Sequence, residues 1–131
     1  NNRYLYFGKA AACLDDIANI IPARLAGLLM VLSAYFSKLD GKNAWRIFRR
    51  DRYNHKSPNS AQTEAACAGA LHVQLGGDSY YFGEFVHKPT LGDDDRPIEP
   101  ADIRLANQVL YWSSSICLLL CGMVKGVILW L

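Results

Sequence analysis

A run of 20 uncharged residues is the feature that most constrains how this chain can fold. It lies between Arg104 and Lys125 and reads LANQVLYWSSSICLLLCGMV. A helix of that length spans about 30 Å, which is the thickness of the hydrocarbon core of a bilayer. The chain stays apolar beyond Lys125, so a membrane segment could also shift toward the C-terminus. We therefore predict a membrane helix over about 103–130, and the alternative is a buried helix of a soluble protein.

A second apolar segment, LAGLLMVLSAYFS, lies between Arg24 and Lys38 and has 13 residues. That length corresponds to about 20 Å of helix, which is too short for an unassisted membrane span. The span would reach further back if Arg24 were paired or faced a polar cavity. We expect a helix over about 22–38, with Pro22 in its first turn, after a helix over about 10–20.

A third apolar segment, AACAGALHVQLGG, consists mainly of small residues. Ala61, Ala65 and Gly69 recur every four residues, so they share one face of a helix. Small side chains let two helices approach closely, which predicts that a helix over about 61–75 packs inside a bundle. The Gly-Gly pair at 76–77 is expected to end this helix.

The remaining segments are predicted to be polar loops, over about 39–60 and about 76–102. A short helix is expected over about 43–50 in the first loop. No alternating strand pattern is convincing in the second loop, although Tyr80 to Val86 fits one short strand. The fold class that follows is all-α, a multi-pass helical membrane protein fragment with a long polar loop region. The lack of an initiator Met at the start, together with apolar segments that need partners, favours a fragment of a longer membrane protein.

Charge is segregated within these loops. Residues 38–56 carry seven basic and two acidic side chains, whereas residues 78–102 carry seven acidic and two basic ones. Such blocks are usually solvated faces, and the alternative is that one receives an anionic substrate and the other a metal or a cation. The net charge of +2 argues against a general nucleic-acid binder, and the four cysteines lack zinc-site spacing.

The segment LDDIANIIPAR places polar side chains in an apolar context. On a helix Asp15 and Asp16 each share a face with Asn19, and such oxygen ligands suit Mg²⁺. Arg24 would hold a phosphate or pair with one of the aspartates. The alternative is that the aspartates only start a helix while Arg24 extends toward water.

The segment RRDRYNHKSPN is a basic loop before a helix, an arrangement that suits a phosphate or carboxylate site. Asn59 or Ser60 could cap that helix. The alternative is an ordinary basic loop beside a membrane. The candidate site residues in this segment are Arg50, Arg52, His55, Lys56, Ser57 and Asn59.

Four further positions are candidates, one within that helix and three after it. Glu64 is either a capping carboxylate or a base and ligand. The segment LGGDSYYFG contributes Gly76 and Gly77, which permit close backbone approach, and Tyr81 as a substrate-binding candidate. It matches no nucleotide-binding glycine motif. The acidic run 93–95 is interpreted as a solvated turn, and the isolated His72 and His87 are not assigned as ligands.

The ordered motifs DDIANIIPARL, DRYNHKSPNS, EAACAGALHVQLGG, YYFG, KPTLG and RPIEPADI together resemble the adenosylcobinamide-phosphate synthase family of cobalamin biosynthesis. The resemblance covers about residues 10–110. It departs from the common family pattern at Ser60-Ala61-Gln62 and at Asp78-Ser79. Members are multi-pass membrane proteins longer than this chain, so the resemblance implies that the chain is a C-terminal portion of a single multi-pass membrane domain.

The resemblance implies ATP-dependent amide formation between adenosylcobyric acid and aminopropanol, or its O-phosphate. A carboxylate needs activation before an amine can attack it, and our hypothesis is an acyl phosphate made from ATP. That route needs Mg²⁺, cationic groups for the phosphoryl and a base for the amine. By residue chemistry, Asp15, Asp16 and Asn19 would hold Mg²⁺, and His55 or Glu64 would act on the amine. The phosphate-binding cations would be Arg24, Arg50, Arg52 and Lys56.

The resemblance also implies a place in the cell inner membrane, where use of ATP would put the active-site loops on the cytoplasmic side. The expected partners are the corrinoid and amine substrates, the lipid membrane and the missing N-terminal part of the same protein. A second hypothesis is a non-catalytic membrane sensor or scaffold of the same superfamily. A scaffold would have no chemical need for the polar motifs quoted above.

Overall fold

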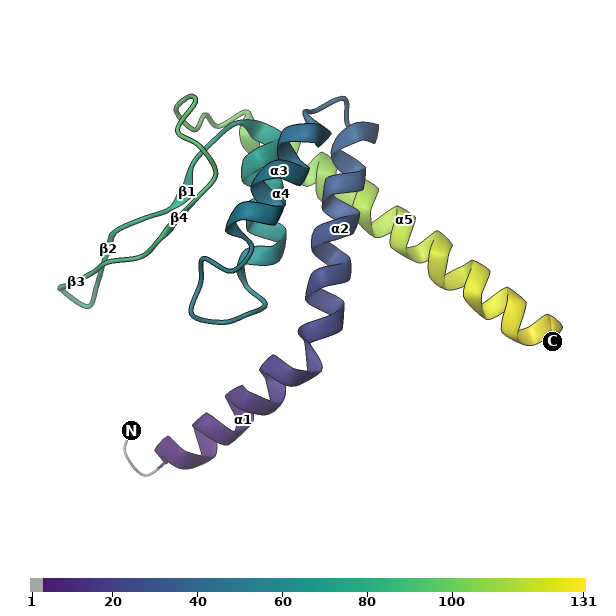
Figure 1. Cartoon of the computed structure of the whole chain (residues 1–131), viewed down its shortest axis with the longest axis horizontal. Coiled ribbons are helices and arrows are strands. Elements are labelled where there is room, and N and C mark those ends of the chain that lie inside the picture. Colours follow the sequence, from purple (N-terminus) through teal and green to yellow (C-terminus); the bar gives the residue numbers. More distant parts are fainter. Residues whose placement is uncertain (1–3) are drawn as a thin grey trace.

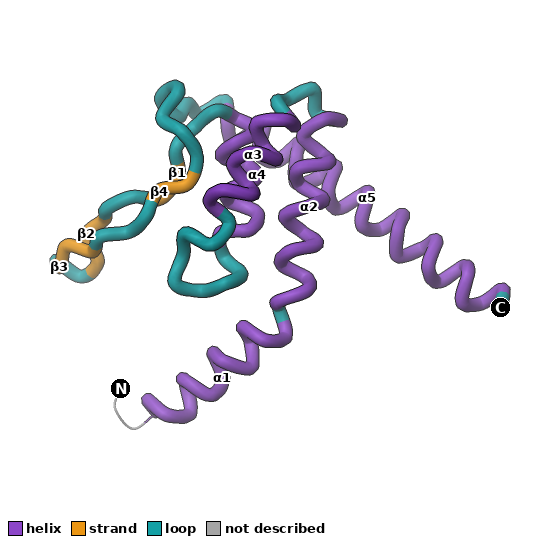
Figure 2. The backbone as a smooth tube through the Cα atoms, viewed as in Figure 1, coloured by secondary structure: helices purple, strands orange, loops and turns teal. Residues whose placement is uncertain are grey.

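Helices make up most of the described chain, in agreement with the predicted helical character (Figures 1 and 2). The computed structural model describes residues 4–131, without the side chains of Leu5 and Tyr81. Helices α2, α3 and α4 pack side by side, while α1 and the C-terminal half of α5 extend away as two arms (Figure 1). The helices are α1 (Leu5–Ala18), α2 (Ile20–Phe36), α3 (Gly41–Asp51), α4 (Ala61–Leu71) and α5 (Asp102–Trp130).

A bend of 49° separates α1 from α2, and Asn19 lies between them. Pro22 is the cause, because it has no N–H for the carbonyl of Ala18 and its ring would clash with that carbonyl in a continuous helix. The prediction that Pro22 lies in the first turn of a helix is confirmed, since α2 begins at Ile20.

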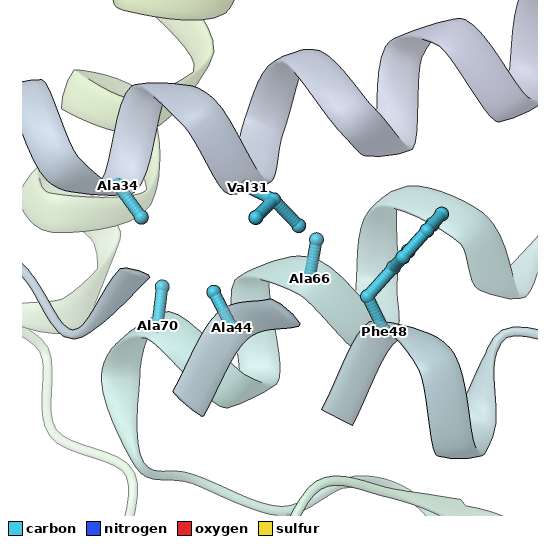
Figure 3. Close-up of a cluster of buried hydrophobic side chains, with 6 residues drawn as sticks. All are labelled: Val31, Ala34, Ala44, Phe48, Ala66 and Ala70. Carbon is cyan, nitrogen blue, oxygen red and sulfur yellow. The ribbon is translucent and has the colours of Figure 1, made fainter. Parts of the chain in front are cut away.

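Small residues bring α2, α3 and α4 together, as predicted (Figure 3). Ala61, Ala65 and Gly69 are all buried. A Cβ added at Gly69 would lie 2.8 Å from the carbonyl oxygen of Asn43 and 2.8 Å from Cβ of Ile47, so only glycine allows this approach of α3. The cluster drawn in Figure 3 consists of Val31, Ala34, Ala44, Phe48, Ala66 and Ala70.

Helix α4 begins at Ala61, as predicted, but its end differs from the prediction. The helix ends at Leu71 rather than near residue 75, because His72 adopts a left-handed backbone with φ 55°. Ser60 is the N-cap residue, but its side chain makes no capping hydrogen bond, and Asn59 bonds to Asp16 instead. The N-cap position predicted at Asn59 or Ser60 is therefore confirmed at Ser60, but without a side-chain capping bond.

The segment predicted as a polar loop over 76–102 contains two short antiparallel strand pairs, which form a ribbon (Figure 2). Leu75–Gly76 (β1) pairs with Thr90–Leu91 (β4), and Ser79–Tyr81 (β2) pairs with Glu84–Val86 (β3). Gly76 and Gly77 have φ values of 77° and 86° and belong to this ribbon, so they do not end α4. The strand allowed over 80–86 is in fact a hairpin, because the chain reverses at two positive-φ residues, 82 and 83.

Helix α5 is long and apolar enough to cross a membrane, and only 6% of its most apolar 18-residue stretch is buried. The bent pair α1–α2 is a second candidate span if the two helices together form a single span. A buried helix of a soluble protein would have its apolar side chains covered. The exposure of α5 therefore favours the membrane interpretation.

Candidate functional site

Asp16 of α1 joins two of the predicted site motifs, which lie about 40 residues apart in the sequence. The Ser57 hydroxyl donates to Asp16 Oδ1 at 2.8 Å. The amide of Asn59 donates to the Asp16 carbonyl at 2.8 Å and lies 3.5 Å from Oδ1. The acidic motif on α1 and the basic loop before α4 therefore meet at one place.

The basic loop is fastened at both ends by Gln62, a residue that sequence reasoning did not select. Gln62 is fully buried at the start of α4. Its Nε2 donates to the carbonyl of Arg52 at 3.2 Å and to that of Pro58 at 3.0 Å. Within the loop, the Ser57 N–H donates to His55 Nδ1 at 3.1 Å. The side-chain amide thus holds the loop in a fixed shape in front of Asp16.

Unsatisfied polar atoms gather at this junction. Among the residues that the structure describes, Asn59 Oδ1, Gln62 Oε1 and Arg52 Nε are buried and lack a hydrogen-bond partner. Buried polar atoms are rarely left without a partner. The Asn59 amide, whose nitrogen bonds to Asp16, has an oxygen of the donor type that Mg²⁺ prefers.

The other predicted magnesium ligands have separate partners. The Asn19 amide donates to Asp15 Oδ1 at 2.9 Å and to the Asp15 carbonyl at 3.0 Å. Within residues 4–131 no three His, Cys, Asp or Glu side chains form a metal-holding group, so a cation here would also need amide, hydroxyl or water oxygens. The set of Asp15, Asp16 and Asn19 remains a prediction.

The remaining candidates on the helices and the loop make no hydrogen bond to Asp16 among the described residues. Arg24 donates to the carbonyl of Ile20 at 2.8 Å, and its guanidinium has no carboxylate partner among the described residues. Arg52 lies over the ring of Tyr53 at 4.7 Å and that of Phe48 at 5.3 Å. His55, Lys56 and Glu64 have exposed side chains.

A groove of about 360 Å³ lies between the ribbon and the basic loop. Gly77, one of the predicted residues, lines it, whereas Gly76 lies beside it in β1. The amide of Asn54 in the loop reaches the carbonyl of Thr90 at 3.5 Å. Tyr81 lies in β2, and its side chain is outside the description. The groove is lined by Asn54, Gly77, Asp78, His87, Lys88, Pro89 and Thr90.

The two charge blocks contact one another, which neither interpretation of them included. Arg46 and Arg50 on α3 both pair with Asp93, so this residue is not part of a freely solvated turn. Hydrogen bonds from Arg46 and Arg50 lower the pKa of the Asp93 carboxyl. Arg50 also pairs with the buried Asp51 at 2.6 Å, and Asp51 accepts the N–H of Gly92 at 2.8 Å. The predicted phosphate ligand Arg50 is thus held between two carboxylates.

His72 also has charged neighbours, so the interpretation of an isolated histidine is wrong. Its Nδ1 lies 2.9 Å from Asp95 Oδ2, and its Nε2 lies 3.1 Å from Asp40 Oδ2. The hydrogen bond to Asp95, followed by that to Asp40, raises the pKa of the imidazole. These carboxylates come from different loops, so no spacing along the sequence could reveal the cluster.

Comparison with known proteins gives a consistent result over nearly the whole chain. A family model described as CobD/Cbib protein matches residues 1–110. A cobalamin biosynthesis protein CobD of Geobacter metallireducens is 49% identical over 98% of this chain, and one of Clostridium perfringens is 48% identical over 98%. A cobalamin biosynthesis protein CbiB of Salmonella arizonae is 46% identical over 92%. The chain spans 38% to 40% of the length of these relatives, and no solved structure matches it significantly.

Proposed function

This chain belongs to the CobD/Cbib protein family, and we propose that, with the rest of its protein, it catalyses ATP-dependent amide formation in cobalamin biosynthesis. The acid would be adenosylcobyric acid, and the amine would be aminopropanol or its O-phosphate. The family indicated by the sequence motifs is confirmed, and the names of the relatives support the pathway. The reaction itself is our proposal.

The observation that carries the proposal is the contact between Asp16 and the basic loop. Amide synthesis from a carboxylate needs anionic and cationic groups in one place, because a phosphoryl group must be positioned and an amine deprotonated. Asp16 accepts from Ser57 and from Asn59, which brings an acidic side chain to a loop that also carries His55 and Lys56. A scaffold would gain little from this combination of side chains.

Each group in the site has a chemical task in the proposal. Lys56 and Arg52 would neutralise phosphate oxygens, and their positions at the loop surface and its edge suit this task. His55 accepts the Ser57 N–H through Nδ1, which puts the ring proton on Nε2, so His55 would take a proton from the ammonium of the amine at Nδ1 after this bond to Ser57 is released. Glu64, exposed in the first turn of α4, is the alternative base.

The donor atoms around Asp16 fit Mg²⁺ by type, since they include a carboxylate and the unsatisfied amide oxygen of Asn59. Asp16 would hold the ion, with Asp15 and Asn19 on the same helix as further candidates. When bound, the ion would neutralise charge on the phosphates of ATP. The contribution of the chain itself is to orient these oxygens through the bonds to Ser57 and Asn59.

We further propose that the protein is a multi-pass protein of the cell inner membrane, with the polar loops on the cytoplasmic side. The exposed apolar length of α5 and the bent pair α1–α2 support this placement. The proposed ATP use supports the cytoplasmic side for the loops.

The test uses the full-length protein in detergent, with ATP, Mg²⁺, adenosylcobyric acid and aminopropanol phosphate. We expect an amide product in the mass spectrum that depends on both ATP and the amine. A folded protein that makes no such product with either amine would refute the enzyme and favour the sensor or scaffold.

A further inference from the structure

Two guanidinium groups on α3 hold one carboxylate between them. Arg46 and Arg50 lie on successive turns of the helix, and both donate to Asp93. Arg50 Nη1 reaches Oδ1 at 2.7 Å, and Arg46 bonds to Oδ2. Two guanidiniums that converge on a pair of oxygens form a fork that also matches the oxygens of a phosphate group.

Both guanidiniums of this fork are held by partners other than Asp93. Arg46 Nε donates at 2.8 Å to Asn43, which is itself anchored to the backbone of α4 by a 2.8 Å hydrogen bond. Arg50 donates to both oxygens of Asp51, at 2.6 and 2.8 Å. The fork would therefore keep its shape if Asp93 left it.

The backbone beside Asp93 is fixed independently of the fork. Gly92 is buried, donates its N–H to Asp51 at 2.8 Å and has a φ of 88°. An added Cβ at Gly92 would lie 2.3 Å from the carbonyl oxygen of Val73, so the segment is closely packed. The Asp93 side chain is 30% exposed. Asp93 can thus leave the fork by rotating its side chain, without movement of the segment.

A solvent-open groove of about 480 Å³ lies on the same face and is lined by Trp45, Arg46, Arg49 and Arg50. The guanidinium of Arg49 lies 5.9 Å from the centre of the Trp45 ring. The groove therefore offers an additional cation, and an aromatic face, next to the fork. This combination suits a ligand that carries more than one phosphate.

We propose that Arg46 and Arg50 form a phosphate-binding site in which Asp93 is a built-in competitor, displaced when a phosphate group binds. The proposal deepens the suggested use of ATP and in that respect rests on the proposed function. Its test, however, needs no turnover. A free polyphosphate and a phospholipid headgroup share the required chemistry, so the experiment distinguishes these two sources.

The experiment measures pyrophosphate binding to the full-length protein by calorimetry in nanodiscs of zwitterionic lipid. Asp93→Asn removes the competitor and should tighten binding about tenfold, whereas Arg46→Gln and Arg50→Gln should each weaken it at least tenfold. Asp94→Asn makes the same charge change next to the fork, and Lys42→Gln removes a cation of α3 outside it. Both controls should change the affinity less than threefold. Equal tightening by Asp93→Asn and Asp94→Asn would overturn the proposal, as would weaker binding by Asp93→Asn.

A second measurement uses the wild-type protein, so it does not depend on the folding of a variant. Pyrophosphate should protect Arg46 and Arg50 from modification by phenylglyoxal, as read by peptide mass spectrometry. Protection that appears only in nanodiscs with phosphatidic acid would identify a lipid headgroup as the source of the phosphate. No protection under either condition would overturn the site. Pyrophosphate binding without amide synthesis would refute the proposed reaction alone.

Discussion

Helices α4 and α5 are both apolar, yet the described chain buries the first and leaves most of the second exposed. In α4, Ala61 and Ala65 have no exposed surface, because their small side chains let α2 and α3 approach. In α5, Leu118 and Leu119 are 75% and 67% exposed. The difference shows that side-chain size, and not hydrophobicity alone, distinguishes α4, which packs against α2 and α3, from α5, which needs an apolar environment outside the described chain.

The largest expected effect is a difference in stability between substitutions at two glycines, one in each of these helices. Gly69→Leu should destabilise the protein by about 3 kcal/mol, because the added side chain would collide with α3. Gly122→Leu should cause no loss, since no atom lies within 4 Å of an added Cβ in α5. Thermal unfolding in detergent, monitored by circular dichroism, measures the loss of stability in both variants. Equal losses would show that α5 is as closely packed as α4.

The next effect concerns membrane insertion of α5. Leu119→Arg should reduce insertion by about 2.5 kcal/mol, because it places a charge near the middle of the apolar segment. Ile98→Arg, at an exposed apolar position before α5, should leave insertion unchanged. A reporter group inserted after α5, whose side of the membrane is read by labelling, reports the outcome. Normal insertion of the Leu119 variant would contradict the membrane interpretation.

The candidate site lies where the C-terminal end of α1 meets the basic loop before α4, and its variants should affect chemistry rather than insertion. Asp16→Ala and His55→Ala should each reduce amide formation at least tenfold, which corresponds to about 1.4 kcal/mol of transition-state stabilisation. Glu84→Gln, in the exposed ribbon, serves as the control. Wild-type rates in both site variants would remove Asp16 and His55 from the mechanism.

The smallest expected effect is a dependence of stability on pH, and it arises at His72, at the end of α4. Asp95 and Asp40 raise the pKa of His72 in the folded protein. The contribution of the protonated imidazole to the free energy of unfolding is therefore fully present below the unfolded pKa of about 6.5. It is lost as the pH rises through the higher folded pKa. The side chain is 41% exposed, and solvent screening limits the effect to less than about 1 kcal/mol. Asn43, also near the ring, carries no charge.

Unfolding midpoints measured between pH 5 and pH 8 test this expectation. In His72→Gln the part of the pH dependence that comes from this imidazole should disappear. Identical pH profiles for the wild type and the variant would show that His72 contributes nothing.

Features that depend on neighbouring residues in the sequence were predicted well. The four-residue spacing of small side chains indicated the buried face of α4, and the uncharged run indicated α5. The position of Pro22 fixed the start of α2 to within a turn. Such signals are local because a helix repeats every few residues.

Features that depend on distant contacts were missed or misread. The ribbon strands are only two or three residues long and mostly exposed, so no alternation marks them. His72, Gln62 and Asp93 gain their roles from side chains or carbonyls on other segments. The motifs at Asp16 and Ser57 were both selected, but their direct contact became visible only in the structure.

The two hydrogen bonds from Gln62 mean that the basic loop is not a portable motif. A synthetic peptide of the loop, or a graft of it onto another helix, would lose the fully buried environment that holds this amide against the Arg52 and Pro58 carbonyls. Antibody epitopes, tags or reporter groups are therefore better placed at the tip of the hairpin. There Gly83 has open space around it and Phe82 is fully exposed.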